Sequence, residues 1–252
     1  EFEYDKLLNI LKAEGNVEIK DNIKDYTIFS KSITYLKNQE KIFTLGKTNA
    51  LINSKYNFET EDIILLKNSM KLNSDRKTKI IDDEFTTYEL DKFEYQINEK
   101  ILKGINIDIT TNSNLSETNR DKYNFKDGIF NLESKDFLAS ETKIKIRKDS
   151  FEDSRNDPRI YGVSSKKTGN ITVLDKAIFT SCGFNDKCPP WSIKAEKIIH
   201  DKNQKKIIYD NSVLKIYDIP VFYFPKFFHP DPTVKRQSGL LQPRLNNSNI
   251  LG

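Results

Sequence analysis

The sequence predicts an all-β protein in which short strands stack as sheet layers around a narrow interior. Alternating apolar and polar residues recur from residue 15 to about residue 218, separated by Asn, Asp, Gly and Lys, which is typical of half-buried strands. Apolar residues make up 37% of the chain and charged residues 31%, against roughly 45–50% and about 25% in average domains. The interior must therefore be thin. Ile, Phe, Leu and Tyr dominate the apolar residues, which favours strands over helices.

The strand pattern is plainest between Ile105 and Thr110. Ile105, Ile107 and Ile109 alternate there with polar residues, so we expect the three isoleucines to share one face of a strand. The opening residues 4–13 fit either a short helix or a capping strand. The same alternation recurs in residues 15–20, 143–147 and 170–173.

A weak internal repeat places an aromatic residue seven positions before an isoleucine. Each copy spans roughly 25–35 residues, enough for two strands and their turns. The copies are therefore expected to stack and to share one continuous interior. Generic hairpins with matching spacing are the alternative. The copies are Tyr26 with Ile33, Tyr56 with Ile63, Trp191 with Ile198, and a looser one from Phe85 to Tyr95 that contains Phe93.

Charge and hydropathy exclude two classes of protein. The net charge of +4 comes from 41 basic and 37 acidic residues that are interleaved along the chain, without the clustered cations of a nucleic-acid footprint. No run of 18 apolar residues predicts a transmembrane helix, although a membrane β-strand needs only about 9–11 alternating residues. Because the chain opens at Glu1 without Met or a signal-like segment, we expect a processed chain or a fragment.

No catalytic constellation stands out in the sequence. It contains no P-loop, no Gly-x-Gly-x-x-Gly, no Gly-x-Ser-x-Gly and no His-Glu-x-x-His, and only two histidines for general-base chemistry near neutral pH. We therefore predict neither an enzyme nor a cofactor. Acidic clusters at residues 59–62 and 82–84 leave a carboxylate-pair glycosidase or lyase as an alternative, but such charges at strand ends are usually solvated turns.

The two cysteines, Cys182 and Cys188, allow three interpretations. They form a disulfide in an oxidising compartment, remain free thiols, or bind a metal. The third needs further ligands close by, and His200 and His229 are poorly spaced for that purpose.

The character of the chain changes after Asp218. Residues 219–232 hold four prolines and five aromatic residues, and proline cannot donate to a strand ladder. We therefore predict three parts: stacked strands at 1–218, an extended, kinked connector at 219–234, and at 235–252 the start of another β-structure. The aromatic residues either plug the open end of the stack or mark a membrane–water interface.

Two segments carry a family resemblance. Residues 180–182 with 189–201 (TSC, then PPWSIKAEKIIHD) resemble the end of the periplasmic domain in the LptD family of lipopolysaccharide (LPS) assembly proteins, once called organic solvent tolerance proteins. Residues 220–225 (PVFYFP) and 231–243 (DPTVKRQSGLLQP) are similar to that family's connector into its outer-membrane β-barrel. The resemblance covers about residues 180–245. Residues 15–175 match only as a looser β-jellyroll repeat, which the family shares with the protein that bridges the periplasm in the same LPS transport system.

The resemblance implies an open, V-shaped stack of strands, the OstA-like β-jellyroll, followed by a truncated barrel. It also implies a function without catalysis: LPS passes from the periplasmic bridge to the outer membrane and is assembled at the cell surface, its acyl chains sliding through the apolar groove. A one-residue slip in register would turn a strand inside out. The residues expected to line the groove are Ile33, Ile63, Phe93, Ile105, Ile107, Ile144, Ile171, Val173 and Ile193.

The resemblance further implies partners and a location at the cell outer membrane, with this portion facing the periplasm. The partners are LPS, an LptA-like bridge protein joined by strand addition at an open sheet edge, and an LptE-like lipoprotein that plugs the missing barrel. Cys182 matches a cysteine bonded to the far end of that barrel, whereas Cys188 departs from the family pattern. The residues implied at the barrel entry and gate are Pro220, Pro225, Gly239 and Pro243, of which Pro243 would weaken strand pairing.

Two other classes of protein remain open. One is a secreted β-solenoid that binds or cleaves polysaccharide and carries a carboxylate groove on an outer face. The other is an adhesin-like structural stack. An apolar interior open along a seam would favour lipid transport, and a sealed dry core would favour either alternative.

Overall fold

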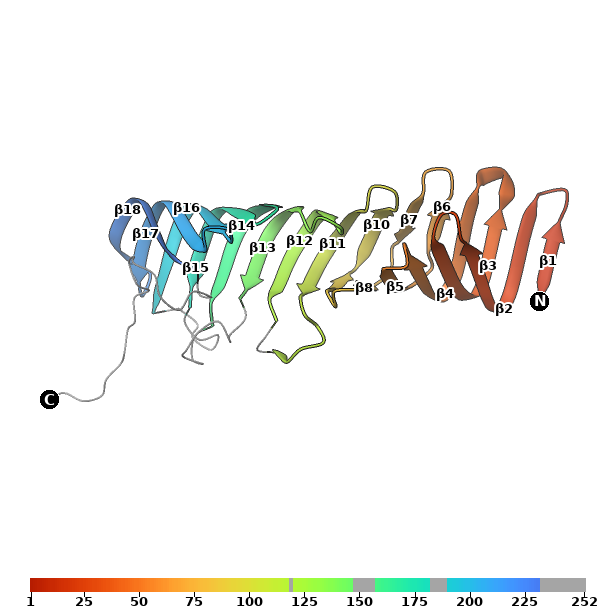
Figure 1. Ribbon diagram of the computed structural model, residues 1–252, viewed down its shortest axis with the longest axis horizontal. Coiled ribbons are helices and arrows are strands. Elements are labelled where there is room, and N and C mark those ends of the chain that lie inside the picture. Colours follow the sequence, from red (N-terminus) through yellow and green to blue (C-terminus); the bar gives the residue numbers. More distant parts are fainter. Residues whose placement is uncertain (118–119, 147–156, 182–189, 232–252) are drawn as a thin grey trace. The chain divides into compact units, whose positions relative to one another are not determined.

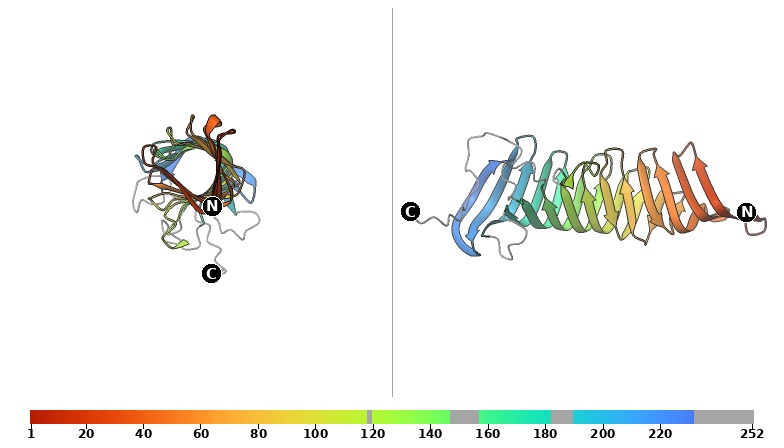
Figure 2. Two further views of the ribbon diagram at one scale, coloured as in Figure 1. Left: turned by 90° about the vertical axis from the view of Figure 1, so that its right-hand side faces the viewer. Right: turned by 90° about the horizontal axis from the view of Figure 1, so that it is seen from below.

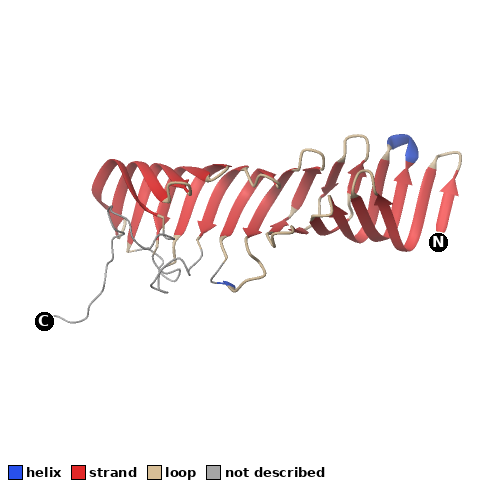
Figure 3. Cartoon of the chain, in the orientation of Figure 1, coloured by secondary structure: helices blue, strands red, loops and turns tan. Residues whose placement is uncertain are grey.

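The computed structural model describes residues 1–117, 120–146, 157–181 and 190–231. These residues form antiparallel strands joined mostly by short turns, one of which holds the short helical segment η1 (Lys37–Gln39) (Figure 3). The all-β prediction is confirmed. Within the described residues, no helix has the length and apolar character needed to cross a membrane.

The chain divides into two compact units, Glu1–Ser140 and Glu141–Gly252. Strand β13 (Phe137–Lys145) contains the boundary between them. The remaining strands of unit 1 (Figure 1) are β1 (Phe2–Asp5), β2 (Ile10–Asp21), β3 (Tyr26–Leu36), β4 (Lys41–Ile52), β5 (Tyr56–Glu61), β6 (Ile64–Leu66), β7 (Lys71–Ser74), β8 (Thr78–Ile81), β9 (Thr87–Leu90), β10 (Lys92–Gln96), β11 (Ile101–Thr110) and β12 (Lys122–Asn131).

In unit 1 the strand ladder divides into two walls and rejoins. Strands β1 to β4 pair in sequence order. The second half of β4 then pairs with β5, and its first half pairs with β6. The first wall continues from β6 through β7 and β10 to the first half of β11. The second wall continues from β5 through β8 and β9 to the second half of β11.

The two walls meet where long strands bend at a residue with positive φ. Gly46 has φ +78° in β4, and Asn106 has φ +50° in β11. Across Asn106 two consecutive side chains, at 105 and 106, lie on the outer face, so the inward alternation changes phase there. From Asn106 onward the bends recur every 35 residues, at Glu141, Lys176 and Asn211. A non-glycine residue held there costs about 1–3 kcal/mol, which the surrounding pairing must offset.

Unit 2 is a simple antiparallel meander. Each strand pairs with the next along most of its length, from β14 through β18, and Figure 2 shows these strands side by side at the blue end of the chain. Besides the end of β13, the strands are β14 (Arg159–Thr168), β15 (Ile171–Thr180), β16 (Trp191–Asp201), β17 (Lys206–Ile216) and β18 (Ile219–Pro230).

The predicted connector is wrong over residues 219–230, because these residues form the paired strand β18. Proline is tolerated for two reasons. First, β18 lies at the end of the meander, beside β17 (Figure 1), and proline is accepted in edge strands. Second, Pro225 falls opposite the bend residue Asn211, where the ladder with β17 is already interrupted. At the other terminus, residues 4–13 belong to β1, a turn and β2, so the strand alternative holds there.

The aromatic and isoleucine repeat marks buried positions. The tyrosine or tryptophan and the isoleucine of all three clear pairs are at most 4% exposed. In unit 1 one apolar cluster of buried side chains extends from Ala13 to Ala139. Burial on this scale supplies the main stabilisation of the fold.

Candidate functional site

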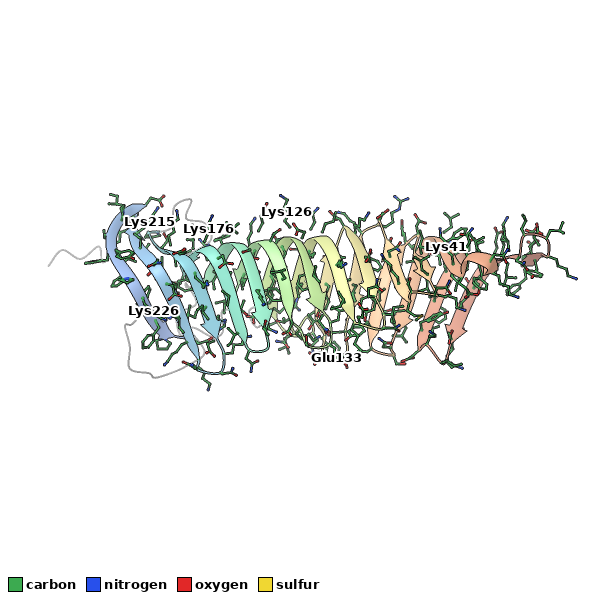
Figure 4. All side chains as sticks on the ribbon, turned by 90° about the horizontal axis from the view of Figure 1, so that it is seen from above. Lys41, Lys126, Glu133, Lys176, Lys215 and Lys226 are labelled. Atoms are coloured by element: carbon green, nitrogen blue, oxygen red, sulfur yellow. The ribbon has the colours of Figure 1, made fainter. Side chains whose placement is uncertain are left out.

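The interior of each unit contains most of the residues predicted to line a groove. In unit 1, Ile33, Ile63, Phe93 and Ile107 are at most 2% exposed. In unit 2, Ile144 and Ile193 are also buried. Six of the nine predicted side chains therefore point inward. Many outward positions carry charge, and the labelled Lys126 and Lys176 project away from the ribbon (Figure 4).

The prediction for Ile105 is wrong. This side chain is 44% exposed, although Ile107 and Ile109 on the same strand are buried. The cause is the bend at Asn106, whose positive φ places residues 105 and 106 successively on the outer face. A strict period of two cannot continue through such a residue.

Ile171 and Val173 are also misplaced by the sequence prediction. Ile171 is 39% exposed and Val173 lies with it on the outer face, while Leu174 and Phe179 are fully buried. Lys176 has φ +47°, and the inward positions change from even to odd numbers across it. If the alternation is continued from the buried Phe179 toward the N-terminus without that bend, residues 171 and 173 are wrongly placed on the inner face.

Besides Phe93, aromatic rings that were not predicted as groove residues line the interior of unit 1. Phe58 on the second wall lies with its ring centroid 5.4 Å from that of Phe93 and 5.3 Å from that of Tyr95, both on the first wall. The Tyr56 ring meets the Tyr95 ring edge-on at 6.2 Å. The two walls are thus joined through their aromatic side chains. Alternation of aromatic residues in β5 and β10 was the available signal.

Each wall has a free edge, formed by the turns at the strand ends that lie away from the bends. We call the line along which the two free edges face each other the seam, and an ion pair joins the two edges there. Lys135 lies in the β12–β13 turn, beside the first wall, since the backbone N–H of Leu132 donates to the carbonyl oxygen of Lys100 at 2.9 Å. Asp82 and Glu84 lie in the β8–β9 turn of the second wall. The Lys135 ammonium contacts the Asp82 carboxylate and lies 3.6 Å from the Glu84 carboxylate. The expected open seam is therefore bridged at this point.

Asp82 is fixed from its own turn as well. Its side chain is fully buried, and one carboxylate oxygen accepts hydrogen bonds from the backbone N–H groups of Glu84, at 3.0 Å, and Thr86, at 2.8 Å. A buried carboxylate requires such partners, because an unpaired buried charge is strongly unfavourable. Asp82 therefore holds both its own turn and the bridge across the seam.

Other ion pairs on the rim stay within one wall. Lys55 in the β4–β5 turn lies 3.1 Å from Asp83 in the adjacent β8–β9 turn. Lys100 in the β10–β11 turn pairs with Glu133 in the next hairpin turn. The edge of unit 1 therefore carries cations and carboxylates directly outside an apolar interior.

In unit 2 the two histidines of the chain gather where β18 ends. The Tyr209 hydroxyl donates to Nε2 of His229 at 2.8 Å in the tautomer whose Nδ1–H donates to the carbonyl oxygen of Pro230, at 2.7 Å. His200 contacts the Asp231 carboxylate. Burial lowers the pKa of His229, and the hydrogen bond to Pro230 and the charge of Asp231 oppose this in part.

The depressed pKa of His229 predicts loss of stability of unit 2 in acid. Because the folded protein favours neutral His229, its free energy of unfolding is greatest above the unfolded pKa of about 6.5. It should decrease as the pH falls from there toward the lower folded pKa, by at most about 1.4 kcal/mol per pH unit.

Denaturant titrations followed by Trp191 fluorescence between pH 7.5 and pH 5 measure this dependence. His229→Gln keeps an acceptor for the Tyr209 hydroxyl and should flatten the profile, whereas the control His200→Gln should retain the contribution of His229. A wild-type profile that stays flat, or one that the His229 variant leaves unchanged, would contradict the assignment.

The other predicted site residues divide between exposed and undescribed positions. Pro220 and Pro225 are exposed residues of β18. Cys182, Cys188, Gly239 and Pro243 lie outside the described residues, as does the predicted start of the barrel at 235–252. Among the residues that the structure describes, no group of three or more His, Cys, Asp or Glu is placed to hold a metal ion.

No family model matches the chain. Individual proteins named LPS-assembly protein LptD do match it. The protein from Polaromonas sp. (strain JS666) is 28% identical over 123 residues, 44% of this chain and 15% of the relative. The protein from Hahella chejuensis is 33% identical over 122 residues, which are 48% of this chain and 14% of the relative. The protein from Legionella pneumophila (strain Paris) is 38% identical over 79 residues, which are 31% of this chain and 9% of the relative.

The chain thus spans only a small part of the length of these relatives, about a seventh or less. Their shared name agrees with the resemblance carried by the motifs around Trp191 and in β18. Over about half of its length, this all-β chain is similar to the LPS-assembly protein LptD.

Proposed function

We propose that the chain serves in LPS assembly at the outer membrane by carrying the acyl chains of LPS through its interior, without catalysis. The observation that supports this most directly is the single apolar cluster from Ala13 to Ala139 in unit 1. Each methylene removed from water gains about 0.8 kcal/mol. A row of apolar side chains shared by successive strands offers such an environment at every step of a sliding chain.

The charged rim supports an amphiphilic cargo over a purely apolar one. Lys55, Lys100 and Lys135 lie at the free edges of the walls, beside the interior. An acyl chain inside unit 1 would leave its head group at this edge, where lysines can meet its phosphates. Aromatic rings of the two walls contact one another, so cargo that enters at the seam moves these rings aside.

The parts of the chain take roles within this proposal. The residues up to the end of β18 at Pro230 carry the lipid in the periplasm, the residues that follow lead toward the membrane, and residues 235–252 begin a barrel in which Gly239 and Pro243 contribute to a lateral gate. Cys182 and Cys188 contribute disulfides. The LPS reaches unit 1 from an LptA-like bridge protein, and an LptE-like lipoprotein fills the barrel.

The first strand offers a place for that bridge. β1 lies at the end of the strand array of unit 1, beside β2 (Figure 1), and all four of its residues are exposed. An exposed edge strand is a template for pairing with a strand of another chain. Strand addition there would continue the apolar interior from one protein into the next.

Photocrosslinking to purified LPS tests the proposal. A photoreactive phenylalanine analogue at Phe93 or Leu174, both buried, should label LPS. The same analogue at Ile105 or Ile171, on the outer faces of the same units, should label little. Labelling confined to the outer positions, or none at any position, would overturn the proposal.

A further inference from the structure

Two buried phenol groups of unit 1 have no hydrogen-bond partner among the described residues. They belong to Tyr56 and Tyr95, which are 1% and 0% exposed. The Asn53 side chain approaches Tyr95 and slightly offsets the rise in pKa that burial causes there, but no hydrogen bond forms. A buried hydroxyl without a partner costs about 1–3 kcal/mol. Such groups in a fold are candidates for contact with a ligand.

The two tyrosines lie at the boundary between the apolar interior and the rim. Tyr56 is the first residue of β5 and Tyr95 is the last but one of β10, so each stands beside the free edge of its wall. Their rings touch across the seam. Two residues further from the edge on the same strands, Phe58 and Phe93 pack together. The two tyrosine rings thus lie nearer the free edge than the phenylalanine pair.

Cations lie just outside this pair. The Lys55 ammonium is 5.7 Å from the centre of the Tyr56 ring. Burial raises the pKa of Tyr56; the charges of Lys55 and Lys135 lower it, and those of Glu133 and Asp82 raise it further, so the ion pairs of the rim act on this hydroxyl. From the interior outward across the seam, the structure presents hydrocarbon, then two hydrogen-bond donors, then lysines paired with carboxylates.

That order matches an acylated amphiphile. We propose that Tyr56 and Tyr95 form a seat for its acyl linkage, donating hydrogen bonds to ester or amide carbonyl oxygens. The acyl chain lies against Phe58 and Phe93, and an anionic head group competes with the rim carboxylates for Lys55 and Lys135. The inference rests on the proposed function and deepens it, since the seat gives a sliding lipid a preferred position in unit 1.

Two probes of equal chain length separate the seat from the interior. Palmitoyl lysophosphatidic acid carries an ester carbonyl and a phosphate, and hexadecyl phosphate carries the phosphate without a carbonyl. Both are titrated calorimetrically, below their micelle concentrations, into the whole chain. Wild type should bind the ester probe roughly tenfold more tightly, the gain expected from a hydrogen bond to an otherwise unpaired donor.

The test variant is Tyr56→Phe with Tyr95→Phe, which removes both hydroxyls and keeps the rings. It should lose the preference for the ester probe, bind hexadecyl phosphate as wild type does, and unfold at a higher temperature without lipid. The matched control is Tyr209→Phe in unit 2, whose hydroxyl is bonded to His229. It should keep the preference and unfold at a lower temperature.

The outcomes distinguish a failure of the lipid-carrying function from a failure of the tyrosine seat. If neither probe binds wild type, the proposed lipid-carrying function fails. If both probes bind but the double variant keeps the ester preference, or loses thermal stability as the Tyr209 control does, the interior carries lipid and the seat at the tyrosines is wrong.

Discussion

Replacing Phe58 by alanine is expected to lower the free energy of unfolding of unit 1 by about 3–5 kcal/mol. The side chain is fully buried, and its ring packs against Phe93 and Tyr95 of the opposite wall. Truncation removes the contact between walls and leaves a cavity that neighbouring strands, fixed by their ladders, cannot close. The loss should therefore exceed the simple transfer free energy of the ring.

The measurement must report on unit 1 alone. The only tryptophan, Trp191, lies in unit 2, so hydrogen exchange of the β5 and β10 amides is the suitable probe. Phe29→Ala is the matched control, because Phe29 is 46% exposed on β3, and it should cost less than about 1 kcal/mol. Equal losses in the two variants would contradict the assignment of inner and outer faces.

Asp82→Ala is expected to be the second most damaging substitution, at about 3 kcal/mol. It removes the carboxylate that accepts from the Glu84 and Thr86 backbone amides and pairs with Lys135. Hydrogen bonds to a charged group contribute about 1.5–3 kcal/mol each, but Lys135 stays partly solvated, which reduces the share of the ion pair.

Two controls separate the contributions of Asp82. Asp82→Asn keeps an oxygen for the backbone amides and loses the charge, so it should cost about 1 kcal/mol. Asp83→Ala breaks an exposed pair with Lys55 and should cost less than about 1 kcal/mol. Hydrogen exchange of the β8 and β9 amides measures each loss. If the Asp82 and Asp83 alanine variants behave alike, the bridge across the seam contributes nothing.

The sequence predicted the strands better than their faces. The fold class follows from composition and alternation, and the buried positions of Ile33, Ile63, Phe93 and Ile107 follow from a period of two residues. The prediction of inward and outward positions fails at bends, where the alternation shifts by one residue. Lys176 occupies a left-handed conformation that is usually expected of Gly or Asn. A lysine at this position therefore gives no sign in the sequence that residues 171 and 173 face outward.

The contacts across the seam depend on long-range topology. Tyr56 with Phe58, and Phe93 with Tyr95, alternate visibly in the sequence, but that they meet follows only from the division of the ladder at β4. Likewise, the proline rule correctly indicates that residues 219–230 are no central strand, yet it cannot distinguish an edge strand such as β18 from a free connector.

The constant distance between bends has a consequence for how the length of such a protein can change. Because Asn106, Glu141, Lys176 and Asn211 are equally spaced, gaining or losing one whole interval adds or removes two strands and keeps every remaining residue on its own face. At about 4.8 Å between neighbouring strands, each interval corresponds to roughly 10 Å. The strand array could thus be lengthened or shortened in steps of one hairpin, without change to the remaining strands.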